Sequence, residues 1–212
     1  MTEKPKIYRN EEIPYEEPEA VERAVNAFKR LPGIGDRTAR RIIYWLLGAS
    51  KDTFGEFVDS LKNLGEQTKT CSICFNISTS DPCHICSSPE RDHSTICVVA
   101  EPQDLAAIEN TRIYNGVYHI LGGVLDPLKG IGPEQLHIDE LIKRVSSEEV
   151  NEVILALDPS NEGEITAKHL SKLLAPTGVK ITVLARGISS GSTLEFVDPK
   201  TLTNALMNRK PI

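Results

Sequence analysis

The segment CSICFNISTSDPCHIC, residues 71–86, indicates that this chain contains a metal-binding module. It holds two Cys-x-x-Cys pairs, made by Cys71, Cys74, Cys83 and Cys86. Each pair forms a tight turn that directs two thiolates to one point, and four thiolates make the closed tetrahedral set that structural Zn²⁺ prefers. The spacing therefore predicts a structural zinc site, and we expect metal, not an apolar core, to fold residues 68–90.

Two other uses of these cysteines bear on the same segment. Disulfides need an oxidising compartment. The polar N-terminus, MTEKPKIYRNEE, does not resemble a secretory signal. The sequence also contains no run of about 18 apolar residues, the length that would be needed to span a membrane. We therefore expect a cytosolic protein with reduced cysteines, in which an iron–sulfur centre stays open as an alternative to zinc. Cys97, inside the apolar run 96–100, is expected to be a small buried hydrophobe, and His84 is a weaker ligand candidate.

The composition predicts a globular protein with an uneven charge. The chain has 212 residues, of which 40% are hydrophobic and 25% charged, so one or two domains are expected. Its net charge of −6 argues against a general polyanion binder. Residues 22–41 nevertheless hold six basic and two acidic side chains, which predicts a phosphate contact confined to one surface. The chain contains no phosphate-binding loop of the G-x-x-x-x-G-K-[ST] type, so nucleotide hydrolysis is not expected.

The segment LPGIG, residues 31–35, separates two predicted helices over residues 18–31 and 36–47. Asp36 is expected to be the N-cap of the second helix. Helical spacing predicts one buried face on that helix, made by Ala39, Ile42, Ile43, Leu46 and Leu47. Trp45 lies among these residues and is expected to belong to the core.

A glycine-containing turn followed by arginines is typical of a helix-hairpin-helix. Gly33 and Gly35 lack a Cβ, so the backbone can approach a phosphate closely. The amides at the start of the next helix then donate to the phosphate oxygens, and Arg37 and Arg41, one turn apart, can flank the same strand. Contacts of this kind read no base sequence. A plain helical turn with a solvated basic face is the alternative.

Beyond residue 95, short apolar runs alternate with helical patterns. The predicted strands cover residues 96–100, 116–121, 153–157 and 179–184. The predicted helices cover residues 105–109, 138–145, 165–174 and 202–207, after an earlier helix over 51–67. This alternation predicts a parallel sheet with crossover helices. The first, third and fourth strands are nearly all apolar, so we expect them to be covered on both faces.

Acidic residues follow two of these strands. Glu101 comes after the first strand and Asp158 after the third, at the edge where parallel sheets place ligands. This pattern resembles the TOPRIM domain, which holds Mg²⁺ with a Glu and an Asp-x-Asp, but Ser160 replaces the second Asp and weakens such a site. The candidate magnesium or partner site comprises Glu101, Asp104, Asp158 and Glu162. The alternative is helix capping, with Asn161 as N-cap and Glu164 as its partner.

Taken together, these motifs resemble the RecR family of bacterial recombination mediators. The resemblance rests on LPGIG, the cysteine pattern, VVAEPQDLAAIE at 98–109, YHILGGVLDPLKGIGPE at 118–134 and EVILALDPSNEGEITA at 152–167. It implies an α/β fold with a helical N-terminal domain. Its parts are an arm at 1–17, a helix-hairpin-helix domain at 18–67, a zinc finger at 68–94, a TOPRIM domain at 95–186 and a subunit-contact segment at 187–212. The long arm departs from the family pattern, as do Asp158, where Asn is usual, and Ser189, where Pro is usual.

The resemblance implies a non-enzymatic role in DNA repair. RecR-like proteins form rings, often tetramers, that encircle double-stranded or gapped DNA without reading its sequence. With RecO, and sometimes RecF, they load RecA onto single strands coated by single-strand-binding protein. On this basis Arg37 and Arg41 contact DNA, with Lys29 and Arg30 on the same surface, in a cytoplasmic protein associated with the nucleoid. The alternative function is a Mg²⁺-dependent TOPRIM nuclease or phosphoryl-transfer enzyme.

Overall fold

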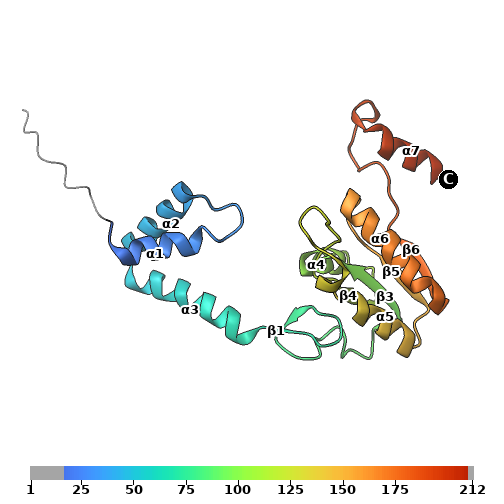
Figure 1. Ribbon diagram of the computed structural model, residues 1–212, viewed down its shortest axis with the longest axis horizontal. Helices are drawn as coiled ribbons and strands as arrows, with labels where there is room; N and C mark the ends of the chain where they lie inside the picture. The colour runs from blue at the N-terminus through green and yellow to red at the C-terminus, as the bar shows by residue number, and fades with distance from the viewer. Residues whose placement is uncertain (1–16, 210–212) are drawn as a thin grey trace, which may run out of the picture. The chain divides into compact units, whose positions relative to one another are not determined.

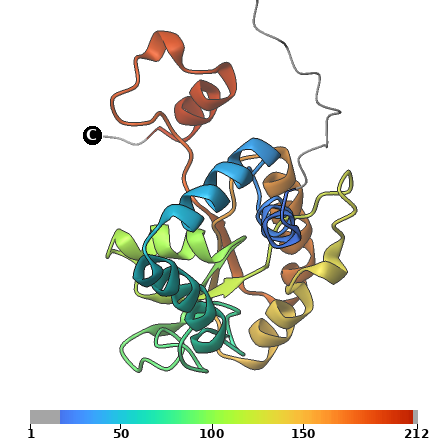
Figure 2. The same cartoon turned by 90° about the vertical axis from the view of Figure 1, so that its left-hand side faces the viewer.

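The computed structural model describes residues 17–209, and the chain divides into two compact units, Met1–Glu66 and Gln67–Ile212 (Figures 1 and 2). The predicted N-terminal arm therefore lies, except for Glu17, outside the described residues. Within residues 17–209, none of the helices has the length and apolar character needed to cross a membrane.

The first unit is built on a pair of packed helices, α1 (Glu19–Phe28) and α2 (Asp36–Gly48). Its buried residues are Val25, Ala39, Ile43 and Leu46. The three on α2 are spaced i, i+4 and i+7, so one stripe of that helix meets α1, as helical periodicity predicts. A third helix, α3 (Lys51–Gln67), confirms the prediction for residues 51–67 but buries none of its residues.

Two expectations for α2 are wrong. Trp45 and Leu47 are 63% and 60% exposed. The single helix α1 covers only a narrow stripe of α2, and these side chains lie outside that stripe. Nor is Asp36 the N-cap: Gly35 holds that position, in an extended conformation, and Asp36 is the first residue of the helix. The Asp36 carboxylate instead accepts hydrogen bonds from Lys29 and Arg40, so the cations compete successfully with the helix amides.

The second unit contains a four-stranded sheet whose order is β4-β3-β5-β6 (Figure 1). The strands are β3 (Asp92–Val99), β4 (Gly116–Ile120), β5 (Glu152–Leu155) and β6 (Lys180–Val183). All three pairings are parallel, which confirms the predicted sheet. In this register Cys97 lies opposite Tyr118 on one side and Ile154 on the other. Cys97 is buried, as expected, and its burial raises the pKa of the thiol to about 12.

The helices of this unit are α4 (Pro102–Asn110), α5 (Ile138–Ser147), α6 (Asn161–Leu174) and α7 (Pro199–Met207), with 3₁₀ turns η1 (Pro133–Gln135), η2 (Ala175–Thr177) and η3 (Leu194–Phe196). Three of these helices, α4, α6 and α7, begin earlier than their apolar patterns indicate, whereas α5 begins at the predicted residue. Pro102 and Pro199 occupy first turns, where their missing N–H groups leave no hydrogen bond unmade. Polar first turns carry no apolar periodicity, so the pattern marks only the helix interiors.

The two edges of the sheet differ in burial, and only β6 departs from expectation. The fourth predicted strand, β6, is an edge strand, and Val183 is 59% exposed. An apolar run has the same local pattern in an edge strand as in a central strand, because the local sequence does not specify the order of the strands in the sheet. The opposite edge strand, β4, is buried along all five residues. There the Ile120 N–H donates to the Cys74 carbonyl at 2.9 Å, so the cysteine module covers that edge.

The cysteine module is consequently part of the second unit and not a separate body. It contains a short antiparallel pair, β1 (Lys69–Thr70) and β2 (Ile77–Ser78). Its cysteines and Ile85 belong to the same buried cluster as the residues of β3 and β4. The expectation that metal alone folds this module is therefore wrong, because Ile85 is only 2% exposed and packs in a shared apolar core.

Candidate metal centre and nucleic-acid interface

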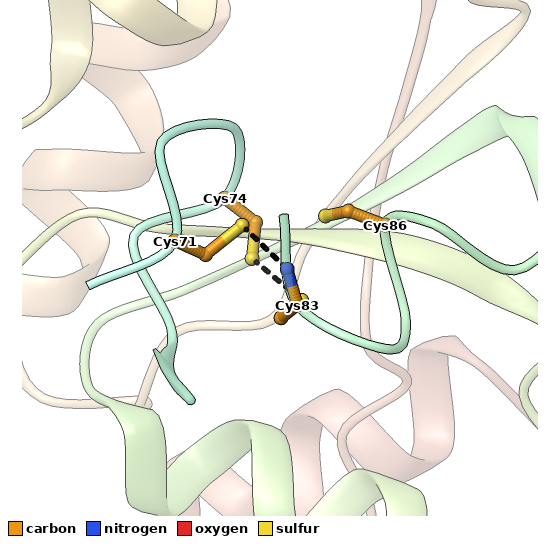
Figure 3. A group of neighbouring side chains, drawn as sticks. All are labelled: Cys71, Cys74, Cys83 and Cys86. Carbon is orange, nitrogen blue, oxygen red and sulfur yellow. Dashed lines mark hydrogen bonds between the residues drawn. The ribbon is translucent and has the colours of Figure 1, made fainter. Parts of the chain in front are cut away.

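The four predicted cysteine ligands converge in the structure (Figure 3). Their sulfur atoms all lie within 4.8 Å of one another, and all four residues are buried. The Cys74 and Cys83 sulfurs are 3.6 Å apart, and the Cys83 backbone N–H donates to the Cys71 sulfur at 3.3 Å. Among residues 17–209, no other group of three or more His, Cys, Asp or Glu residues is gathered this closely. The donors match the closed set of a structural metal site.

The charge of this cluster also fits a divalent cation. A hydrogen bond from Cys86 lowers the pKa of Cys74 to about 6, and the same bond, with burial, raises the pKa of Cys86. Burial also raises the pKa of Cys83. Four adjacent thiolates repel one another and are poorly solvated, so all four are stable only with a cation among them. Zn²⁺ held by Cys71, Cys74, Cys83 and Cys86 would supply that charge and complete the module's fold.

Local backbone hydrogen bonds shape the first cysteine turn. The Phe75 N–H donates to the Cys71 carbonyl at 2.9 Å, and the Cys71 N–H donates to the Asn76 carbonyl at 2.8 Å. The Ser72 N–H donates to the Asp81 carboxylate at 2.7 Å, which lowers the pKa of Asp81. The first two bonds close the turn within residues 71–76, and the third ties it to Asp81, nine residues after Ser72.

The predicted hairpin forms between α1 and α2. The Ile34 N–H donates to the Leu31 carbonyl at 3.2 Å, and Gly33 has φ +77°, a left-handed conformation that favours glycine. Gly35 then precedes α2, and the first intrahelical bond runs from the Ala39 N–H to the Gly35 carbonyl. The earlier first-turn amides have no acceptor within the helix, and together with the helix dipole they form an anion-binding end.

The basic residues of the first unit differ in how they are paired. Lys29 donates to Asp36 at 3.1 Å, and Arg40 pairs with both Asp36 and Glu17. Hydrogen bonds from Lys29 and Arg40 lower the pKa of Asp36, so the carboxylate stays charged at neutral pH. Among the described residues, none of the ion pairs includes the exposed cations Arg30, Arg37 and Arg41. The predicted DNA surface therefore has three unpaired guanidinium groups and a Lys29 already bound to an acid.

The predicted carboxylates are spread along the carboxyl edge of the sheet. Glu101 and Asp104 lie at the start of α4, where the Glu101 N–H donates to the Asp104 carboxylate at 2.9 Å. Asp104 and Asp158 both line a cavity of about 620 Å³, whereas Glu101 and Glu162 are not among its lining residues. The four carboxylates do not form a gathered group of metal ligands.

The alternative of helix capping at this edge is confirmed, but Asn161 and Glu164 are not the capping residues. Ser160 is the N-cap of α6, and its hydroxyl accepts from the Gly163 N–H at 3.1 Å. Helix α6 therefore begins at Asn161, one residue after the true cap. Glu164 does not act as a capping partner, because its carboxylate pairs with Arg186 at 2.7 Å and Lys200 at 2.9 Å. These pairs join α6 to Arg186 and to Lys200 of α7, and no sequence pattern links three residues so far apart.

Four segments of the chain match models of known protein families. Family models match as follows: RecR, helix-hairpin-helix at 21–64; RecR, four-cysteine zinc finger domain at 68–88; Toprim domain at 94–185; and RecR, C-terminal at 187–210. The chain is 48% identical over 190 residues to "Recombination protein RecR" of Gloeobacter violaceus, which covers 90% of this chain and 96% of that protein. It is 46% identical over 191 residues to the protein of the same name from Bifidobacterium longum subsp. infantis, with the same coverage of each.

Proposed function

The chain belongs to the RecR family of recombination proteins, and we propose that it is a DNA clamp that mediates recombinase loading. A role in DNA recombination and repair follows from the family. The proposed finer role is to act with RecO, and in some pathways RecF, to load RecA onto single strands coated by single-strand-binding protein. The site of action would be the nucleoid in the cytoplasm. The proposed DNA substrate is double-stranded or gapped and is bound without sequence preference.

The unpaired arginines beside the hairpin carry this proposal. Arg37 and Arg41 are exposed on α2, immediately after a glycine turn that presents helix amides to an anion. Neighbouring Lys29 and Arg40 are neutralised by Asp36 and Glu17, so phosphate attraction is concentrated on the unpaired groups. A protein of net charge −6 can then hold DNA through one small basic surface.

Exposed apolar side chains support assembly into a ring of several copies. Helix α3 has no buried residue and exposes Phe54, Val58 and Leu61 along one face. In the C-terminal segment, Phe196 is 82% exposed and Met207 is 76% exposed. Apolar faces of this kind are usually covered in an assembly. We propose a homotetramer with one interface at each end of the chain.

We propose that the TOPRIM region has no catalytic role. Its carboxylates are not gathered as metal ligands, and Ser160, which stands where a second Asp would be, is engaged as a helix cap. The competing function is a Mg²⁺-dependent nuclease or phosphoryl-transfer enzyme, which Glu101 and Asp158 would serve by holding the ion. The two functions differ in one observable, strand cleavage.

One incubation series on gapped, fluorescent DNA with Mg²⁺ separates these functions. It compares wild type, Arg37→Glu with Arg41→Glu, and Glu101→Ala, each with and without the RecO-type partner, scoring binding and strand breaks. We expect salt-sensitive binding by wild type and by Glu101→Ala. The double variant should lose most binding, because two phosphate contacts become repulsions. No protein should cut the DNA.

A matched control uses Arg23→Glu, because Arg23 is an exposed arginine of the same unit that is already paired with Glu19. This variant should bind DNA nearly as wild type does. Normal binding and repair by the Arg37/Arg41 variant would reject the clamp interface. Cleavage by wild type that disappears in Glu101→Ala would make the protein an enzyme.

A further inference from the structure

The residue after the first cysteine pair has an unfavourable backbone conformation. Phe75 has φ 65°, in the left-handed region that glycine tolerates and that costs other residues roughly 1–2 kcal/mol. Glycine would relieve this strain in a turn whose bonds involve only the Phe75 backbone. A bulky aromatic side chain at a strained position indicates that the ring makes contacts that compensate for the strain.

The Phe75 ring packs between two histidines of the parallel-sheet region. It stacks on His137, with ring centroids 3.8 Å apart and planes at 9°, and meets the edge of His119 at 5.4 Å. His119 lies on β4, and His137 directly precedes α5. The His119 Nε2 donates to the His137 backbone carbonyl at 2.7 Å, which fixes the orientation of the His119 ring. The ring of Phe75 thus joins the cysteine turn to the connection between β4 and α5.

From His137 a continuous series of hydrogen bonds leads to the carboxyl edge of the sheet. The His137 ring Nδ1 donates to the Ile120 carbonyl at 3.1 Å, and its backbone N–H donates to the Leu121 carbonyl at 2.9 Å. The next two residues, Gly122 and Gly123, both donate to the Ala100 carbonyl at 3.0 Å. Ala100 immediately precedes Glu101, the first candidate carboxylate.

We infer that Phe75 is a positioning residue that couples the metal-loaded cysteine module to the backbone on which Glu101 is placed. The inference rests on the metal-binding role proposed for the four cysteines, but not on DNA binding by the hairpin. Loading the cysteines holds Phe75 against His137, and His137 in turn holds the 121–123 backbone against Ala100. Loss of the metal therefore loosens the carboxyl edge of the sheet as well as the module. By linkage, loss of the ring lowers the affinity of the module for metal.

Phe75→Gly tests this coupling, because it removes the ring while relieving the backbone strain. In the zinc-loaded full chain, we expect hydrogen exchange at the amides of residues 121–123 to become about tenfold faster, the order expected from loss of a stacked aromatic contact. Phe75→Tyr keeps the ring and should restore slow exchange. Ile113→Gly, which removes an apolar side chain that is 88% exposed in the same unit, is the control and should change nothing at these amides.

A second variant keeps the inference testable if Phe75→Gly fails to hold zinc. His137→Ala removes the other half of the stack and leaves the cysteine turn intact. We expect the same faster exchange at residues 121–123, together with faster zinc release to a chelator. In wild type, zinc removal should speed exchange at 121–123 in addition to residues 68–90.

Unchanged exchange at residues 121–123 in both zinc-loaded variants would overturn the coupling, as would an effect of zinc removal confined to residues 68–90. These outcomes are separate from the clamp proposal, because DNA binding by the Arg37 and Arg41 surface is measured independently. Phe75→Gly that still binds DNA but exchanges rapidly would support both.

Discussion

The cysteine cluster and the carboxylate edge lie in the same compact unit, and both contain four candidate metal ligands, yet only one forms a gathered site. The four sulfurs are buried within 4.8 Å of one another. The carboxylates are spread over the starts of α4 and α6, and Glu101 and Asp158 are exposed to water. Donors that already lie close together bind a metal ion without a further rearrangement of the chain. Residue type and number alone therefore do not make a site.

The origin of the two ligand sets explains this difference. Each cysteine pair comes from a turn of four residues, whose geometry is local. Glu101 and Asp158 come from strands separated by more than fifty residues, and their placement depends on the order of the whole sheet. Asp104 also has a hydrogen-bonding partner close by in the sequence, because its carboxylate accepts from the Glu101 N–H.

The largest expected effect is the loss of one member of the cysteine cluster. Cys71→Ser should abolish stoichiometric zinc and lower the free energy of unfolding by more than about 4 kcal/mol, because the metal and the shared core are lost together. Glu101→Ala, at the exposed edge, should lower it by less than about 1 kcal/mol. Metal analysis and urea unfolding measure both variants.

The comparison would fail if Cys71→Ser were stable and metal-free with an unchanged oligomer. It would also fail if Glu101→Ala destabilised the protein as much as the cysteine variant. Cys97→Ser is a useful control, since Cys97 is a buried cysteine outside the cluster. That variant should keep zinc.

A smaller effect is expected at the helix cap that replaces a TOPRIM carboxylate. Ser160→Ala should lower the free energy of unfolding by about 1 kcal/mol, because the Gly163 N–H loses its acceptor. Asn161→Ala changes a residue already inside α6 and should be neutral or slightly stabilising. Urea unfolding of the zinc-loaded proteins measures both. A larger loss of unfolding free energy in Asn161→Ala than in Ser160→Ala would show that Asn161 is the cap.

The smallest effect concerns the ion pairs of Glu164 with Lys200 and Arg186. Hydrogen bonds from Lys200 and then Arg186 lower the pKa of Glu164 to about 2. The native pKa lies below the ordinary value of 4.5, so the stabilisation is complete above that value and is lost as pH falls toward 2. Hydrogen exchange in α7 should be faster in Glu164→Gln than in wild type at neutral pH.

This difference between Glu164→Gln and wild type should shrink as the pH falls from about 5 toward 2. High salt should shrink it as well, since Lys200 and Arg186 are partly exposed. An equal exchange rate in both proteins at neutral pH would show that Glu164 does not hold the C-terminal segment.

Several features were predictable because they depend on short-range pattern. The cysteine spacing, the helix-hairpin-helix and the alternation of strands and helices are all local, and the structure confirms them. The wrong predictions concern burial, which depends on how other helices and strands pack against a residue. Trp45 is exposed because α1 covers only one stripe of α2, and β6 is half-exposed because it lies at an edge.

The sequence by itself determined the family, the four sulfur ligands and the parallel α/β architecture, because turns, periodicities and ligand spacings act over a few residues. Only the tertiary structure decided that the cysteine module shares the core of the sheet, that Phe75 stacks on His137 and that Glu164 pairs with Lys200. These contacts join residues that are distant along the chain. Their energy comes from burial and charge pairing that exist only after the strands have taken their order.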